Sequence, residues 1–312
     1  MADTRHSDHV DILGVGSSPS DGFYHGSVMN IEAAQKNMWQ AMEQAEAMSG
    51  IQIGPVYVGI SAPHIRCVNS HGVVSIHNRE VTKRDVRKAW DAARAQPTSA
   101  DRETLHVILQ KYKVDTTETL KPLGMSGSRL EVGTHIITGS TSSTQDVVKC
   151  ANLCGMDVMM LMATPLAAAE AVLTLDERNH GACVLNIDRD ITGMTIFSQG
   201  SVEHTSVLAV EQMSQLSETV NRLPRNIQTV VLTGDPSVTS DRIEWAVSTF
   251  NRSVRIGRPQ QGMGGLVDKV ANPAFAASVG LVLYASRYHQ TDTGEEGWMH
   301  TLLNKLRGLW LV

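Results

Sequence analysis

The stretch VLNIDRDITG, residues Val184 to Gly193, is the most informative part of this chain. It begins as an apolar strand, passes through a turn containing Asp188, Arg189 and Asp190, and is followed at once by a second apolar run, MTIFSQG. This pattern is typical of two strands joined by a tight turn. Three interpretations are open for such a charged turn: a working ligand loop, a damaged ligand loop, or a plain hairpin.

The segments around this stretch alternate between strands and helices in two successive halves. In the first half, VDILGVGSS and PVYVGIS are predicted strands on either side of a helix over Ile31–Ser49, with Gly50 at its C-cap. This order favours a parallel sheet covered by helices. In the second half, residues 182–210 predict three strands joined by tight turns, and further strands follow at NIQTVVLTG and SVRIGRP. The sequence therefore predicts an α/β fold of two related lobes, each with its own sheet.

Residues 63–133 have a different texture and are predicted to form an inserted α+β subdomain. The stretch HIRCVNSHGVVSI alternates in polarity like a hairpin, and REVTKRDVRKAWDAARAQ is typical of a charged amphipathic helix. Thr82 and Asp85 have the spacing of a capping box at the start of that helix. The stretches TLHVILQKYKVD and RLEVGTHIITGS then return to strand character. The histidines are scattered without ligand spacing, so no metal site is predicted.

The composition limits the classes to which the protein can belong. Its 312 residues suit one large domain or two of ordinary size, and 42% hydrophobic with 19% charged residues is typical of soluble globular proteins. A net charge of -5 and a pI near 6.2 give no basic stripe, so nucleic acid is not an expected partner. The polar start lacks the apolar core of a signal peptide, and we expect a reducing cytoplasm. Cys150 and Cys154 are expected to be buried small hydrophobes rather than a metal or redox pair.

The C-terminal stretch WMHTLLNKLRGLWLV forms a strongly amphipathic pattern after the polar stretch HQTDTGEEG. Two interpretations are open: a helix docked on its own domain, or a helix that binds a membrane reversibly. The polar linker, a tryptophan near each end and cations on the polar face favour the membrane. The predicted membrane-binding residues are Trp298, Met299, Leu302, Leu303, Leu306, Leu309 and Trp310, with Lys305 and Arg307.

Several stretches, in order along the chain, resemble the FtsA family of bacterial cell-division proteins. They include VYVGISAPHI, LHVILQKYKVD, PLGMSGSRLEVGTHIIT and PLAAAEAVLTLDERNHGACVLNID, and the similarity runs from about Val10 to Tyr284. The resemblance implies an actin-like (actin/Hsp70-type) fold of two lobes, an inserted subdomain called IC, and a C-terminal amphipathic helix that targets the membrane. It also implies a protein that tethers the tubulin-like FtsZ polymer to the membrane.

The resemblance divides the chain into six parts and implies that the fold is shortened. Two strands at the start of the family's fold have no counterpart, and subdomain IIB is largely absent after Val210. The edge left by the two strands favours self-association. The parts are 1–62, the start of subdomain IA; 63–133, subdomain IC; 134–175, the rest of IA; 176–285, subdomain IIA; 286–297, a linker; and 298–312, the amphipathic helix.

The nucleotide-binding motifs of the family are changed in this chain. The first phosphate loop lies between the two strands without a counterpart. The second, D-I-G-G-G-T-T-D, aligns with residues 186–193, which read NIDRDITG. The glycines of the family motif let backbone N–H groups approach the phosphates, and side chains replace all three of them here. The family's LTGGG aligns with residues 232–236, which read LTGDP. The resemblance therefore assigns a degenerate nucleotide site to Asn186, Asp188, Arg189, Asp190, Thr192, Gly193, Gly234 and Asp235.

Acidic side chains in place of these glycines oppose the charge of a polyphosphate. We therefore expect no tight binding of ATP or Mg²⁺, no hydrolysis and no catalytic residues. The leading hypothesis is a reduced FtsA-like scaffold or adaptor, peripheral on the inner face of the cell membrane at the division septum. Its expected partners are FtsZ or other divisome proteins, and its predicted contact in subdomain IC consists of Glu80, Arg84, Arg87 and Trp90.

Two alternatives remain open at the level of sequence. One is an actin-like switch that still depends on ATP, which the retained fold favours. The other is a shortened chain that keeps the fold but has lost the function, by drift or by design.

Overall fold

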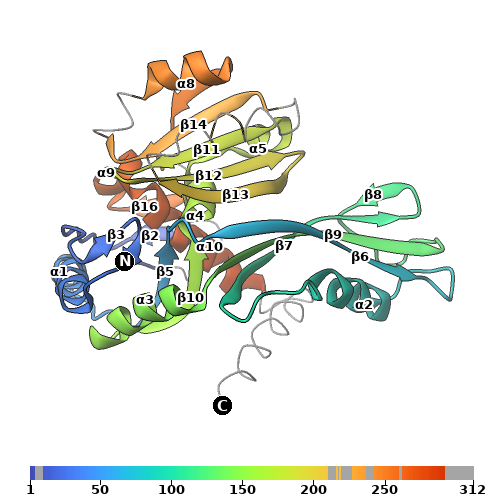
Figure 1. Ribbon diagram of the computed structural model, residues 1–312, viewed down its shortest axis with the longest axis horizontal. Helices are drawn as coiled ribbons and strands as arrows, with labels where there is room; N and C mark the ends of the chain where they lie inside the picture. The colour runs from blue at the N-terminus through green and yellow to red at the C-terminus, as the bar shows by residue number, and fades with distance from the viewer. Residues whose placement is uncertain are drawn as a thin grey trace.

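The computed structural model describes residues 1–3, 10–209, 216, 218, 227–236, 242–259 and 262–291. Figure 1 shows two lobes, one above the other, and an elongated insert that extends to one side. We call residues 10–62, 141–172 and 262–291 lobe I, residues 63–140 the insert, and residues 173–259 lobe II.

Lobe I contains the predicted first helix and parallel strand pairing. The helix α1 covers Ile31–Ser49, the predicted bounds, because Asn30 caps its start and Gly50 ends it in the left-handed conformation at φ 70°. The strand β5 (Pro55–Ile60) pairs in parallel with β10 (Asp157–Ala163), whereas β2, on the other side of α1, pairs with β1 and β16 in a separate sheet. The other elements are β1 (Ala2–Asp3), β2 (Val10–Ile12), β3 (Phe23–Tyr24), β4 (Ser27–Val28), α3 (Thr141–Leu153), α4 (Thr164–Val172), β16 (Met263–Gly265), α9 (Val267–Val270), the 3₁₀ helix η2 (Pro273–Phe275) and α10 (Ala276–Thr291).

Lobe II is built on one mixed sheet with the strand order β13-β12-β11-β14-β15. The first three strands pair in an antiparallel meander, as the sequence predicts, whereas β14 and β15 join β11 in parallel. Buried apolar side chains of β11, β12 and β14 pack with the helix α8 into a core of their own. The elements are α5 (Leu175–His180), β11 (Ala182–Ile187), β12 (Ile191–Ser198), β13 (Ser201–Ala209), β14 (Thr229–Gly234), α8 (Ile243–Phe250) and β15 (Ser253–Ile256).

The helix α4 lies between the two lobes and is the centre of the largest core. Ala167, Ala168 and Ala169 are completely buried, and the helix packs against α10 on one side and the lobe II sheet on the other. Small side chains allow these layers to approach closely. The two lobes therefore share one continuous hydrophobic core.

The insert is a four-stranded antiparallel sheet with α2 (Lys83–Arg94) on one face, as Figure 1 shows. Thr82 and Asp85 form the predicted capping box of this helix. The predicted hairpin at residues 64–76 is wrong, because β6 runs through it as one strand. Gly72 lies where α2 crosses the strand: a Cβ there would be 1.8 Å from the Ala89 carbonyl oxygen. The strands are β6 (Arg66–Ser75), β7 (Arg102–Val114), β8 (Thr117–Thr119) and β9 (Arg129–Ser140).

The C-terminal part of the described chain differs from the prediction in one respect. The helix α10 runs to Thr291 and so includes the start of the predicted linker, 286–297. It continues because no Gly or Pro occurs from Leu281 to Thr291. The predicted membrane-binding residues, 298–312, lie outside the described residues. Within the part of the chain that the structure describes, no helix has the length and apolar character needed to cross a membrane.

Candidate functional site

The predicted turn of the opening stretch connects β11 and β12 as a tight hairpin at the cleft between the lobes. Asn186 pairs with Gly193 in the ladder, and the backbone N–H of Asp188 donates to the Ile191 carbonyl at 2.9 Å. The Asn186 amide donates to the Asp188 carboxylate at 3.3 Å. Asp188 is half-buried at the base of the turn, whereas Arg189 and Asp190 are exposed. The stretch therefore forms a tight hairpin between two strands of the lobe II sheet.

Asp235, just after β14, lies beside the hairpin tip. Its backbone N–H donates to the Ile187 carbonyl at 2.8 Å, and its carboxylate is 3.4 Å from the Arg189 guanidinium. The pKa of Asp188 is raised to about 6, first by burial and then by the nearby charges of Asp235 and Asp190. The hairpin tip is consequently acidic, and the exposed Arg189 lies beside the acidic groups.

The hairpin also contacts lobe I. The backbone N–H of His25 donates to the Asp190 carboxylate at 3.2 Å. His25 occupies the turn between β3 and β4 with φ 45°, a left-handed conformation. The carboxylate from lobe II thus accepts a backbone N–H from lobe I.

Two glycines of the predicted site have packing reasons for their presence. A Cβ at Gly193 would lie 2.4 Å from the Pro165 ring at the start of α4. Gly234 has φ 104°, and a Cβ there would lie 2.3 Å from the Ile187 carbonyl oxygen. Thr192, between these elements, is fully buried in β12. Gly193 thus allows β12 to lie close to α4, and Gly234 allows the close approach of β14 to β11.

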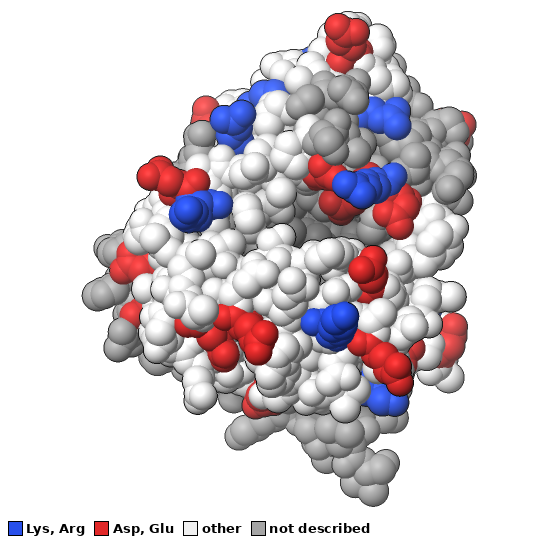
Figure 2. Space-filling model, turned by 90° about the vertical axis from the view of Figure 1, so that its left-hand side faces the viewer, with Lys and Arg blue, Asp and Glu red and all other residues white. Residues whose placement is uncertain are grey.

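The arrangement offers little to a polyphosphate. The backbone N–H groups of Asp188, Asp235 and His25 each donate to an oxygen of the protein itself. Figure 2 shows this face of the molecule, hollowed between the lobes, with acidic side chains on both rims. Phosphate-binding loops rely on unengaged backbone N–H groups and on cations. Here those N–H groups are engaged and the dominant charge is negative.

The four residues predicted to contact a partner protein through the insert differ in their exposure. Glu80, Arg84 and Arg87 are exposed at or before the start of α2. Trp90 is half-buried, donates its indole N–H to the Tyr112 hydroxyl at 2.7 Å, and packs against the core of the insert. Trp90 thus holds the helix on the sheet, and only the three charged residues are on the surface.

Sequence analysis missed an interface between the insert and β13. Gln110 donates to the Val202 carbonyl at 2.7 Å, and the Asn69 amide donates to the Glu203 carbonyl at 3.0 Å. His135, completely buried, joins both sides. We call this set the insert–β13 interface: Asn69, Gln110 and His135 of the insert with Ser201, Val202, Glu203 and Thr205 of β13.

His135 is the central residue of the insert–β13 interface. Its Nδ1 lies 2.6 Å from the Asn69 side-chain oxygen, which can only accept, so Nδ1 carries the proton. Its Nε2 then accepts from the Thr205 hydroxyl at 3.1 Å. The pKa of His135 is lowered to about 4, first by burial and then by the nearby His204. The imidazole is therefore neutral at physiological pH.

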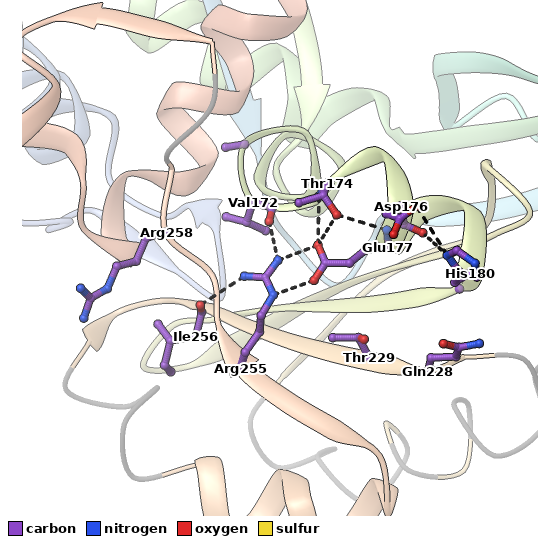
Figure 3. Close-up of a pocket in the computed structure, with 12 residues that line it drawn as sticks. Val172, Thr174, Asp176, Glu177, His180, Gln228, Thr229, Arg255, Ile256 and Arg258 are labelled. Atoms are coloured by element: carbon purple, nitrogen blue, oxygen red, sulfur yellow. Dashed lines mark hydrogen bonds and ion pairs between the residues drawn. The ribbon is translucent and has the colours of Figure 1, made fainter.

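A second hollow, of about 390 Å³, lies at the far end of the lobe II sheet from the hairpin tip. Figure 3 shows Arg255 directed at Glu177, with two ion-pair hydrogen bonds of 2.7 Å each. Arg255 also donates to the Val172 carbonyl at 2.7 Å, and Glu177 completes a capping box with Thr174. These charges satisfy one another and tie β15 to α4 and α5, so the hollow is a structural junction.

Comparison with known proteins agrees with these features. A family profile described as the SHS2 domain inserted in FtsA matches residues 62–138, which nearly coincide with the predicted insert. The cell-division protein FtsA of Pseudomonas aeruginosa is 30% identical over 347 aligned residues, which cover 88% of this chain and 83% of that protein. The chain belongs to the FtsA family.

Another FtsA protein supports this assignment, and one solved structure supports the fold. The FtsA of Escherichia coli K12 is 38% identical over 200 residues, which cover 64% of this chain and 48% of that protein. A solved PilM–PilN type IV pilus biogenesis complex is similar in fold, with a TM-score of 0.60 at 14% identity, over 86% of this chain and 89% of that one. The actin-like α/β fold expected for an FtsA relative is confirmed, and the chain is an FtsA-type cell-division protein.

Proposed function

We propose that this protein is a membrane-associated scaffold or adaptor of the cell-division machinery that works without binding or hydrolysing ATP. Backbone and side-chain groups of the protein itself make the contact between the lobes at the cleft. The observation that carries this proposal is the hydrogen bond of 3.2 Å from the His25 N–H to the Asp190 carboxylate, in the turn that resembles the second phosphate loop of the family. In this proposal a carboxylate of the protein takes the place of an anionic ligand.

The charge at the cleft supports the same proposal. A phosphate group approaching Asp188, Asp190 and Asp235 meets like charges, each worth on the order of 1 kcal/mol at a partly shielded site. A bound Mg²⁺ could offset some of this repulsion, but the phosphates would still lack the donor groups that other phosphate-binding loops supply. Tight binding of Mg-ATP is therefore disfavoured by charge and by hydrogen bonding.

The insert–β13 interface adds a second connection between the parts of the molecule. Lobe II is joined to lobe I at the hairpin tip, and to the insert along β13. An actin-like switch would use its nucleotide to bring two lobes together. Here side chains make those connections, so the scaffold needs no cofactor to fix the arrangement of its surfaces.

The partners in this proposal are those of a divisome adaptor. The C-terminal amphipathic segment would bind the inner face of the cell membrane at the division site. The exposed part of the insert, at Glu80, Arg84 and Arg87, would contact FtsZ or another division protein. Self-association of the chain is a further expected contact.

Titration calorimetry with Mg-ATP tests the proposal. We expect no binding in the micromolar range by the purified full chain and no release of phosphate above the rate without protein. Micromolar binding of Mg-ATP would instead support the alternative, an actin-like switch that still depends on its nucleotide.

A further inference from the structure

The outer face of α2 carries a concentration of cations. Lys83, Arg84, Arg87 and Lys88 are all exposed, while the intervening Val86 faces the core of the insert. The chain as a whole has a net charge of -5. The outer face of α2 is therefore positively charged on a protein whose net charge is negative.

The positions of these cations are unfavourable for the helix itself. The N-terminal end of a helix is the positive end of its dipole, and cations there are destabilising. Lys83 and Arg87 are four residues apart, as are Arg84 and Lys88, and like charges at this spacing repel. The acid in the first turn, Asp85, is committed to the capping box, where it accepts from the Thr82 N–H at 3.1 Å. The dipole at this end of the helix therefore opposes the cations, although Lys88 and Asp85 attract each other electrostatically.

Two exposed leucines lie beside the start of this helix. Leu120 is 69% exposed and Leu123 is 50% exposed. Two backbone hydrogen bonds fix their loop to Val81, the residue just before the cap: the Gly124 N–H donates to the Val81 carbonyl at 3.0 Å, and the Val81 N–H donates to the Met125 carbonyl at 2.9 Å. An apolar patch therefore adjoins the cationic face.

We propose that these six residues form a docking surface for an acidic segment of a partner protein that also carries apolar side chains. Acidic side chains of the segment would pair with the cations, and its apolar side chains would cover the leucines. The inference rests on the proposed function, because a scaffold without a nucleotide cycle acts through such contacts. The α2 docking surface consists of Lys83, Arg84, Arg87, Lys88, Leu120 and Leu123.

The pattern of charge favours a peptide over an anionic membrane. Asp85 and Asp91 lie on the same helix among the cations. The net charge of -5 would oppose approach to an anionic lipid surface as a whole. A short peptide interacts with the local pattern only, and it can match cations and leucines together.

Fluorescence anisotropy with defined peptides tests this inference on the full chain. The probe is a labelled peptide that repeats Glu-Glu-Leu, compared with peptides of equal length that repeat Lys-Lys-Leu or Glu-Glu-Ser. We expect only the first to bind well, and binding to weaken as salt is raised. The double substitution Arg84→Glu/Lys88→Glu should weaken binding about tenfold or more. The double substitution Leu120→Ser/Leu123→Ser should weaken binding roughly fivefold.

A matched control separates docking from general charge. Lys36 on α1 and Lys149 on α3 are exposed cations of lobe I, and Lys36→Glu/Lys149→Glu changes the net charge by the same amount. The control should bind the probe like the unchanged chain. No variant should unfold at a lower urea concentration than the unchanged chain, and Arg84→Glu/Lys88→Glu should unfold at the same or a higher one, because it removes cations from the start of α2.

Three results would overturn the inference. They are no binding of the Glu-Glu-Leu probe, an equal loss of binding in the control, or binding to anionic vesicles that depends on Arg84 and Lys88 without binding to the peptide. These results leave the proposed function standing, because Mg-ATP calorimetry decides that separately. Conversely, peptide binding together with tight ATP binding would keep the docking surface and reject the nucleotide-independent scaffold.

Discussion

The backbone N–H of His25 in lobe I donates to the carboxylate of Asp190 in lobe II at 3.2 Å. We predict that Asp190→Ala and Asp190→Asn differ in stability. Both substitutions remove the negative charge near Asp188, but only Asn keeps an oxygen that can accept from His25. Asn should therefore retain about 0.5–1.5 kcal/mol more free energy of unfolding than Ala.

Urea unfolding measures this difference, and hydrogen exchange at the His25 amide reports the bond directly. Exchange should be faster in Asp190→Ala than in Asp190→Asn. Equal exchange rates and equal stabilities in the two variants would mean that the bond does not form in solution.

Asp188 makes the stability of the protein depend on pH. Its pKa is raised from 3.8 to about 6 in the folded state. The folded state therefore holds this proton more tightly than the unfolded state, and the contribution of Asp188 to stability becomes more favourable as pH falls from about 7 towards 4. Asp188→Asn should raise the free energy of unfolding at pH 7 by about 2 kcal/mol and remove this part of the pH dependence. Denaturant unfolding at several pH values checks both effects; an unchanged slope would contradict them.

His135 should act with the opposite sign over an overlapping pH range. Its pKa is lowered from 6.5 to about 4, so the folded state resists its protonation. Stability from this residue is present above pH 6.5 and is lost as pH falls towards 4, by roughly 2–3 kcal/mol. His135→Gln keeps hydrogen-bonding groups but does not titrate, so it should flatten that loss. The His135→Gln/Asp188→Asn double variant serves as the control, because it should show neither contribution.

Elements with a local signal could be predicted from the sequence. The bounds of α1 follow from apolar residues at helical spacing and from Gly50, whose left-handed conformation ends the helix. The β11–β12 hairpin follows from two apolar runs around a charged turn. In both cases the residues that define the element are neighbours in the chain, so the pattern contains the necessary information.

Contacts between remote segments could not be predicted in this way. Gln110 and Val202 are 92 positions apart, and nothing near either residue indicates the other. The polar Gln110 and His135 within apolar strands gave the one available signal, since a buried polar side chain needs a partner. The hairpin expected at residues 64–76 shows a different error: its alternating polarity belongs to one long strand, β6, and Gly72 within that strand allows α2 to pack closely on it.

The packing of α2 on β6 gives a prediction about that glycine. A Cβ at Gly72 would lie 1.8 Å from the Ala89 carbonyl oxygen and 2.6 Å from the Ala93 nitrogen, both in the helix backbone. Gly72→Ala must therefore displace α2 and should lower the free energy of unfolding by about 3 kcal/mol or more. Gly133→Ala in β9 is the control, because its Cβ would meet ordinary contacts of 3.5 Å and longer. Similar losses in urea unfolding for both variants would show that strand glycines are sensitive in general.

The predicted membrane-binding segment can be tested by co-sedimentation with anionic vesicles. The full chain is compared with one that ends at Gly297, and a variant with Trp298→Ser and Trp310→Ser serves as a third sample. Because an interfacial helix binds through its apolar face, and cations add attraction to anionic lipid, the full chain should pellet and the other two should remain largely in the supernatant. Lys305→Glu/Arg307→Glu should weaken pelleting most at low salt, since screening already reduces the electrostatic part at high salt. If the full chain and the chain ending at Gly297 pellet to the same extent, the segment does not bind the membrane, and any membrane association must come from elsewhere in the protein.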